Sequence, residues 1–219
     1  MPTEEEILDE LKTAVIEGDS DRAKKISIES LALKMDPMLA ISDGLMKGIG
    51  VVAERFANYG MFVTEVMLSA DAMKAAMDVL RPSITGKKLS DLMVGKVVIG
   101  TVRGDIHDIG KNIVSTLLEA SGFEMHDLGI DVSTMKFIEK AQEVHAQIIA
   151  ASALLSTTAP YQAEIVKALD EMKLRNKHKV MIGGCVTTRK WADEIGADGY
   201  GEDAIEAVRV ARTLMGSHK

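Results

Sequence analysis

The sequence predicts an α/β protein in which a bundle of four helices precedes a doubly wound parallel sheet of five strands. In the first third of the chain, apolar residues recur at the spacing of amphipathic helices with short connections. From residue 97 onward, short apolar runs alternate with helical patterns, which is typical of a parallel sheet with right-handed crossovers. The polar, turn-rich residues 83–95 separate the two patterns. We therefore predict a helical domain over residues 1–90 and an α/β domain over residues 91–219.

Capping and stop signals set the limits of the four predicted helices. Thr3 and the three acids after it start the first helix, and Gly18 ends it. Asp19 caps the second helix, the third covers about residues 37–57, and the fourth covers about residues 64–80. Three glycines lower the helix propensity of the third helix, which predicts close helix contacts at Gly44, Gly48 and Gly50.

The second half of the chain has the pattern of five strands and five helices in alternation. Strands are expected near residues 97–102, 123–129, 148–154, 179–183 and 197–201. Helices are expected near residues 110–121, 133–145, 160–175, 188–195 and 203–214. Five parallel strands connected in this way fit a flavodoxin-like order, in which ligands bind at the carboxyl ends of the strands. The loops that follow the strands are therefore the first place to look for function.

Composition limits the classes of partner. The chain has 219 residues and 47% hydrophobic residues, which is enough for two cores. The net charge of −7 argues against nucleic acid and against an anionic membrane surface as partners. No segment approaches 18 uninterrupted apolar residues, and the acidic N-terminus is unlike a signal peptide. The single cysteine, Cys185, excludes an internal disulfide and fits a reducing compartment, so we expect a cytoplasmic protein.

The loop of residues 104–110 carries the strongest chemical signal. It lies between the apolar run of residues 97–102 and a helical pattern, at the end of the first predicted strand. His107 stands between two aspartates there, so one ring nitrogen could bind a ligand or metal while a carboxylate holds the other. The alternative is a solvated loop histidine.

Three motifs now suggest a family. Asp105-x-His107-x-x-Gly110 resembles the DxHxxG motif of cobalamin-binding domains that hold the corrinoid base-off and His-on. Ser152-x-Leu154 resembles the SxL motif of these domains, and Gly183-Gly184 resembles their GG motif. Residues 1–90 resemble the helical cap of methionine synthase and of methyltransferase corrinoid proteins. All three motifs occur in order, each at a predicted strand end.

The resemblance implies a flavodoxin-like cobalamin-binding domain in which His107 displaces the benzimidazole of the cofactor and ligates cobalt. Neutral imidazole suits such a metal, and Asp105 would accept the other ring N–H. A hydroxyl after the SxL motif completes a relay in the family, with Thr158 the best match and Ser156 the second. Asp108 has a plain alternative as a helix N-cap. Gly110 has a steric explanation, because a side chain would obstruct either a planar ring or the tight turn.

The displaced base needs a slot, and the ends of the later strands are expected to form it. We expect the cofactor to be bound by the loop and these strand ends, namely Gly104, Asp105, Ile106, His107, Asp108, Ile109, Gly110, Ser152, Leu154, Ser156, Thr158, Gly183, Gly184, Tyr200 and Gly201. Over the other corrin face, the resemblance implies apolar cap residues, chiefly Phe62 and Met67 and also Leu68. Cys185 stands where the family usually has alanine, and we expect it to be a small buried neighbour.

A cap followed by a cobalamin domain suggests a carrier, which is not catalytic alone. The resemblance implies the corrinoid protein of a three-component system of methanogenesis or acetogenesis. There Co(I) takes a methyl group from a methylamine, methanol, a methoxylated aromatic or a quaternary amine on a substrate-specific methyltransferase. The methylcobalamin so formed gives the group to coenzyme M or tetrahydrofolate on a second methyltransferase, and a reductive activation protein restores Co(I). Alternatives are a corrinoid-binding sensor or storage module, and a receiver-like phosphotransfer domain.

Overall fold

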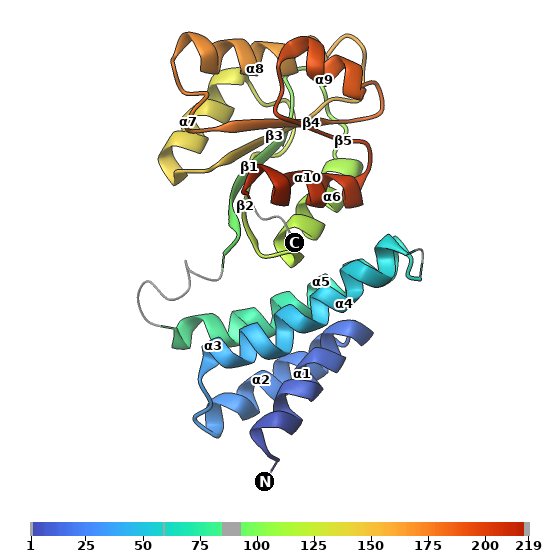
Figure 1. Cartoon of the computed structure of the whole chain (residues 1–219), viewed down its shortest axis with the longest axis vertical. Helices are drawn as coiled ribbons and strands as arrows, with labels where there is room; N and C mark the ends of the chain where they lie inside the picture. The colour runs from blue at the N-terminus through green and yellow to red at the C-terminus, as the bar shows by residue number, and fades with distance from the viewer. Residues whose placement is uncertain (1, 59, 85–92, 217–219) are drawn as a thin grey trace. The chain divides into compact units, whose positions relative to one another are not determined.

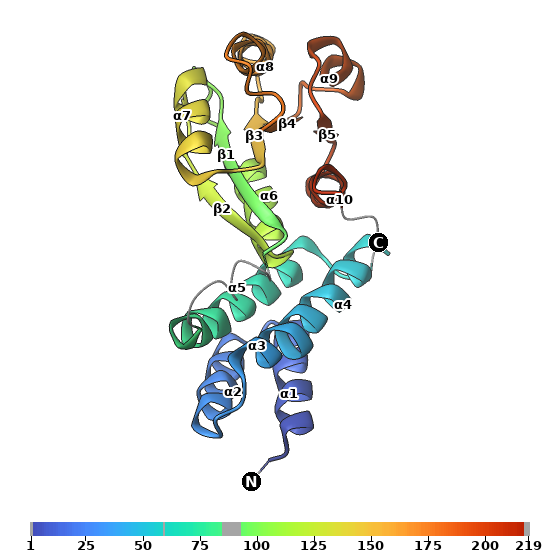
Figure 2. The same ribbon diagram turned by 60° about the vertical axis from the view of Figure 1, so that its left-hand side comes forward.

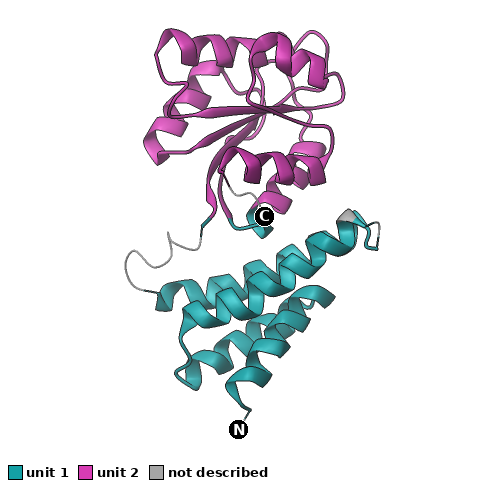
Figure 3. Cartoon of the chain, in the orientation of Figure 1, with its two compact units in different colours: residues 1–93, 119–122 teal, residues 94–118, 123–219 magenta. Residues whose placement is uncertain are grey.

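The computed structural model describes residues 2–58, 60–84 and 93–216 of the chain. The chain divides into two compact units, one made of residues 1–93 and 119–122 and the other of residues 94–118 and 123–219 (Figure 3). The predicted domain boundary after residue 90 lies outside the described residues, as does most of the predicted linker. It therefore stays a prediction, and each unit is considered by itself.

The first unit is the predicted bundle of four helical segments (Figure 1). Its elements are α1 (Glu4–Glu17), α2 (Ser20–Ala32), α3 (Pro37–Leu39), the π-helical turn Ala40–Leu45, α4 (Met46–Ala57), α5 (Val63–Leu80) and a 3₁₀ turn, Arg81–Ser83. The predicted third helix is thus one run in which a π-helical turn separates α3 from α4. Thr3 starts α1 through a complete capping box with Glu6, and Gly18 ends it in the left-handed conformation at φ 70°.

The glycines of the third helical segment differ in their surroundings. A Cβ atom on Gly48 would lie 2.8 Å from the Lys12 carbonyl oxygen, and one on Gly44 would lie 3.0 Å from the Leu11 Cβ. These two glycines therefore allow the close contact with α1 that their presence predicted. The prediction was wrong for Gly50, because that residue is exposed and a Cβ there would meet no atom within 4 Å.

The second unit alternates strands and helices throughout (Figure 2). Its strands are β1 (Gly95–Thr101), β2 (Phe123–Asp127), β3 (Ile148–Ser152), β4 (Lys179–Gly183) and β5 (Gly199–Gly201). Its helices are α6 (Ile109–Ala120), α7 (Thr134–Val144), α8 (Pro160–Glu171), α9 (Arg189–Ile195) and α10 (Ala204–Leu214). All strand pairs are parallel, and the order β2-β1-β3-β4-β5 confirms the predicted flavodoxin-like sheet.

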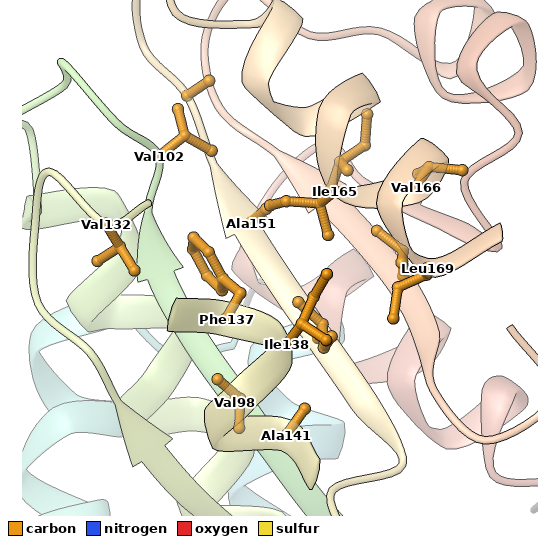
Figure 4. Close-up of a cluster of buried hydrophobic side chains, with 14 of the residues drawn as sticks. Val98, Val102, Val132, Phe137, Ile138, Ala141, Ala151, Ile165, Val166 and Leu169 are labelled. Carbon is orange, nitrogen blue, oxygen red and sulfur yellow. The ribbon is translucent and has the colours of Figure 1, made fainter. Parts of the chain in front are cut away.

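Apolar side chains cover both faces of the sheet, as the near-continuous hydrophobic strands require. On one face, residues of α7, α8 and α9 pack on the strands around Phe137, Ile165 and Leu169 (Figure 4). On the other face, Leu118 of α6 and Ala211 of α10 pack against the strands. Within the described part of the chain, no helix combines the length and apolar character needed to cross a membrane.

The strand order determines where the loops meet. The chain leaves β1 toward β2 on one side, and β3, β4 and β5 follow on the other side. The crevice between β1 and β3 is therefore the topological switch point, where open α/β sheets bind ligands. The loops after β1, β3 and β4, which carry the three motifs, all leave the same edge of the sheet.

Candidate functional site

His107 lies in the loop between β1 and α6 with its imidazole half-exposed. Its side chain is 47% exposed, and Nδ1 lies 2.7 Å from the Asp105 Oδ1. A carboxylate acceptor at this distance places the ring proton on Nδ1. Nε2 then carries the lone pair and is the nitrogen that could coordinate a metal. The loop itself is held in place because the Thr101 hydroxyl donates to the His107 carbonyl oxygen at 2.8 Å.

Asp105 is completely buried and connects two of the three motif loops. Its Oδ1 accepts from the His107 ring and from the His107 backbone N–H at 3.1 Å. Its Oδ2 accepts from the backbone N–H groups of Leu154 at 2.7 Å and Leu155 at 3.3 Å. The Thr158 hydroxyl also donates to Oδ2 at 2.7 Å. One carboxylate thus joins the loop after β1 to the loop after β3.

This arrangement stabilises the charged form of Asp105. Burial alone would raise the pKa of Asp105. The hydrogen bonds from His107, the Leu154 N–H and the Thr158 hydroxyl outweigh burial and hold this pKa well below its ordinary value. A buried anion therefore lies directly behind the imidazole, where it strengthens Nε2 as a donor to a metal.

The structure distinguishes the two candidate hydroxyls. Thr158 is buried and bonds Asp105, whereas Ser156 is exposed. Ser152 is half-buried at the end of β3, where it pairs with Gly183 of β4. The SxL motif therefore contributes to the site mainly through its backbone, because the N–H of Leu154 reaches Asp105.

The GG motif is a point of close backbone approach. Gly184 has φ 120°, and a Cβ atom on it would lie 1.9 Å from the Ala153 carbonyl oxygen. A Cβ on Gly183 would lie 3.1 Å from the Gly201 carbonyl oxygen. The loops after β3 and β4 can therefore approach each other only with glycine at residue 184. The prediction that Cys185 is buried was wrong, because Cys185 lies exposed in the turn that the Thr187 N–H closes on the Gly184 carbonyl oxygen at 3.0 Å.

Replacing Gly184 by alanine is expected to destabilise the second unit by well over ~2 kcal/mol, because steric overlap with Ala153 adds to backbone strain. Gly196→Ala is the matched control, since Gly196 also has positive φ (73°) but a Cβ there would lie 3.9 Å from its nearest neighbour. That control should cost only the ~1–2 kcal/mol of a left-handed alanine. Urea unfolding of both variants measures the difference, and equal losses would mean that the close approach to Ala153 is unimportant.

Gly110 has no steric partner among the residues that the structure describes. A Cβ atom there would meet nothing within 4 Å, so the strand-to-helix turn does not require glycine. The space beside Gly110 is therefore open, which leaves room for a bulky planar group beside His107. Asp108, which precedes α6, accepts from the Asn112 side-chain amide at 3.1 Å.

Large aliphatic side chains are exposed around the loops at this edge of the sheet. Ile106 is 71% exposed and Ile109 is 79% exposed in the loop of His107. Three more exposed residues follow β2, β3 and β4, namely Ile130, Leu155 and Val186. We call these five residues the apolar rim. Exposed aliphatic groups gathered at one edge indicate a binding surface for an apolar ligand.

Ile130, Leu155 and Val186 were not predicted as site residues, although large aliphatic residues in loops at strand ends are a signal of a binding surface. Lys111 was not predicted either, and its buried ammonium lies 2.7 Å from the Asn112 Oδ1 and 2.5 Å from the Asp127 Oδ2. This pair holds the start of α6, and thus the loop of His107, against the end of β2.

The remaining predicted residues lie further along the chain or in the other unit. Tyr200 is half-buried at the end of β5, beside Gly201, and its hydroxyl donates to the Thr187 carbonyl oxygen at 3.0 Å. Burial and the charge of Glu202 raise the pKa of Tyr200, against the opposing effect of Arg189. Phe62 and Met67 belong to the helical unit, where both side chains are exposed on or beside α5.

Comparison with known proteins identifies both parts of the chain. Residues 95–209 and residues 7–81 each match a family model described as a B12 binding domain. A corrinoid protein of Desulfitobacterium hafniense is 46% identical over 96% of this chain and 98% of its own length. Dimethylamine corrinoid protein 1 of Methanosarcina acetivorans is 45% identical over 97% of this chain and 99% of its own length.

Solved structures agree with these sequence relatives. The methanol:cobalamin methyltransferase complex MtaBC of Methanosarcina barkeri contains a chain that matches with a TM-score of 0.87 at 30% identity, covering 100% of this chain and 82% of that one. A cobalamin-binding protein of Desulfitobacterium hafniense matches with a TM-score of 0.73 at 31% identity, covering 94% and 98%. The chain therefore belongs to the family of corrinoid proteins of methyltransferase systems, with a helical domain and a B12 binding domain.

Proposed function

We propose that this protein binds cobalamin, that His107 would ligate its cobalt, and that the protein carries a methyl group between two methyltransferases. The observation that supports this most strongly is the arrangement of His107, with Nδ1 bonded to a buried carboxylate and Nε2 left to coordinate. A solvated loop histidine would not need a fully buried aspartate with five hydrogen bonds behind it.

The residues of the site fit a corrinoid. The apolar rim offers aliphatic contacts to a large, flat ring around His107. The open space at Gly110 admits such a ring beside the loop. Glycine at residues 183 and 184 keeps side chains off the backbone at the end of β4, beside which we propose that the displaced base binds. The metal-binding nitrogen, the apolar contact surface and the open space therefore all fit a bound corrinoid.

Each residue of the site has a separate role. When bound, cobalamin supplies a cobalt centre that takes up and releases a methyl group. Asp105 keeps the proton on the His107 Nδ1, so that Nε2 presents its lone pair. The Thr158 hydroxyl supports the charge on Asp105, and the apolar rim excludes water. We propose that Phe62 and Met67, exposed in the helical unit, protect the opposite corrin face.

The relatives suggest the kinds of partner. The relatives include proteins named dimethylamine corrinoid protein and trimethylamine corrinoid protein. One matched structure is of a methanol:cobalamin methyltransferase complex. We propose that this chain works with a substrate-specific methyltransferase for a methylamine, methanol or related donor. A second methyltransferase would transfer the group to coenzyme M or tetrahydrofolate, and a reductive activation protein would restore Co(I). We also propose that the protein acts in the cytoplasm, in keeping with its single cysteine.

A reconstituted methyl-transfer assay tests the proposal. Purified holoprotein, at a concentration far below that of the donor, is combined with candidate donor and acceptor methyltransferases under reducing conditions. Many turnovers per corrinoid, lost when the holoprotein is left out, would support a carrier. A protein that binds cobalamin tightly and exchanges no methyl group with any partner would instead be a storage or sensor module.

A further inference from the structure

Gln162 is a fully buried polar residue of α8. Its side chain bonds residues at the ends of β3 and β4 and a residue of α9. Its Nε2 donates to the Ala151 carbonyl oxygen at 2.9 Å and to the Gly183 carbonyl oxygen at 3.0 Å. Its Oε1 accepts from the Trp191 indole N–H at 3.1 Å. Two carbonyl acceptors on one side and an N–H donor on the other fix the orientation of the amide.

These bonds join the ends of β3 and β4. The two strands pair up to Ser152 and Gly183, and beyond this pair only the Ala153 N–H bond to the Gly183 carbonyl oxygen continues the ladder. Gln162 reaches the strands from the first turn of α8 and bonds a carbonyl group on each of them. Its amide therefore fixes the ends of β3 and β4 relative to each other, at the place where the regular ladder stops.

The third bond extends this control to α9. Trp191 lies in the first turn of α9, and its backbone N–H is capped by Thr188. The segment between Gly184 and Thr188 connects β4 to this helix. Gln162 thus holds both ends of the loop that contains the GG motif, through Gly183 at its start and Trp191 just after it.

We infer that Gln162 is a positioning residue for the nucleotide tail of the cofactor, because it fixes the backbone at the ends of β3 and β4, beside which the tail would lie. The inference rests on the proposed function, since it assumes that the displaced base binds beside these strand ends. Gln162 itself is not proposed to contact the cofactor. It acts through the backbone of Ala151 and Gly183.

A comparison of two corrinoids isolates this role. Hydroxocobalamin carries the nucleotide tail, whereas diaquocobinamide has the same corrin ring without it. Gln162→Met keeps the length of the side chain but leaves the Ala151 carbonyl group and the Trp191 indole without this partner. We expect its dissociation constant to rise about tenfold or more for cobalamin and to stay near the wild-type value for cobinamide.

Gln147→Met is the matched control. Gln147 also bridges two backbone segments, accepting from the Lys96 N–H of β1 at 2.8 Å and donating to the His145 carbonyl oxygen after α7 at 3.2 Å, but it is exposed and lies at the opposite edge of the sheet. It should leave both dissociation constants unchanged. Gln162→Glu retains the acceptor for Trp191 and loses the two donated bonds, so it gives the same test if Gln162→Met does not fold.

The outcomes separate the inference from the proposed function. A selective loss of cobalamin affinity supports a role for Gln162 in positioning the strand ends beside the nucleotide tail. Equal losses for both corrinoids, or no loss for either, would overturn that role while the wild-type protein still bound cobalamin. A wild-type protein that bound neither corrinoid, or bound cobalamin with its own base on cobalt, would overturn the proposed function itself.

Discussion

His107→Gly is expected to abolish protein ligation of cobalt and to reduce methyl transfer strongly. Loss of a hydrogen-bond partner of a metal ligand typically costs ~10–100-fold, and loss of the ligand itself should exceed that. Because the imidazole is 47% exposed, its removal leaves no cavity in the core, and loss of its hydrogen bond to the buried Asp105 should lower the free energy of unfolding by only ~1–2 kcal/mol. Absorbance titration with hydroxocobalamin and the reconstituted transfer assay measure the two effects.

Rescue and a matched control sharpen this test. Added imidazole can occupy the space left in His107→Gly and should restore part of the ligation. His145→Gly removes another exposed histidine, at a left-handed position (φ 55°) that glycine adopts readily. That control should bind and transfer like the wild type. Unchanged transfer in His107→Gly would show that the histidine has no role at cobalt.

Asp105→Asn is expected to lower the free energy of unfolding by ~2–4 kcal/mol at neutral pH, as well as to weaken cobalamin binding. The carboxylate accepts five hydrogen bonds in a fully buried position. An asparagine amide would turn its NH₂ group toward N–H and O–H donors. The loops after β1 and β3 would then lose the group that joins them.

The effect of Asp105→Asn depends on pH in a defined direction. The folded protein holds the pKa of Asp105 well below its ordinary value, which is about 3.9 in an unfolded chain. Its contribution to stability is therefore complete above that value and is lost as pH falls toward the folded pKa. The difference in unfolding free energy between wild type and Asp105→Asn should be largest near neutral pH and smaller near pH 3, which urea unfolding at both pH values measures.

Two further variants measure how much each candidate hydroxyl contributes to the stability of the site. Thr158→Val removes one donor to Asp105 and should cost ~1–2 kcal/mol. Ser156→Ala alters the exposed second candidate and should stay within ~0.5 kcal/mol of the wild type. If Ser156→Ala cost as much as Thr158→Val, the assignment of the hydroxyl would be wrong. A deficit in Asp105→Asn that did not shrink at acidic pH would contradict the charged state of Asp105.

Local patterns predicted the fold and the position of the loops, because each depends on short stretches of sequence. The apolar strand before Gly104 and the helical spacing after Gly110 were sufficient to place His107 at a strand end. The pairing of Asp105 with the N–H groups of Leu154 and Leu155 could not be predicted, because it depends on the separation of two loops that lie far apart in the sequence.

Long-range packing also accounts for the other differences. Gln162 is one polar residue at the start of an amphipathic helix, and only its contacts with two strands reveal a role. Gly44 and Gly50 look alike in the sequence, yet one faces α1 and the other is exposed. Cys185 follows a strand, and whether it is buried depends on the direction in which the loop turns at Gly184.

Identifying the source of the nitrogen bound to cobalt tests most directly whether His107 is the ligand. Protein labelled with ¹⁵N only in histidine is loaded with cobalamin of natural isotopic abundance, reduced to Co(II), and studied by electron paramagnetic resonance. If His107 is the ligand, the nitrogen superhyperfine pattern changes from the triplet of ¹⁴N to the doublet of ¹⁵N, and His107→Gly loses the doublet. A triplet that persisted in the labelled protein would show that the benzimidazole of the cofactor remains on cobalt, and would contradict the site proposed here.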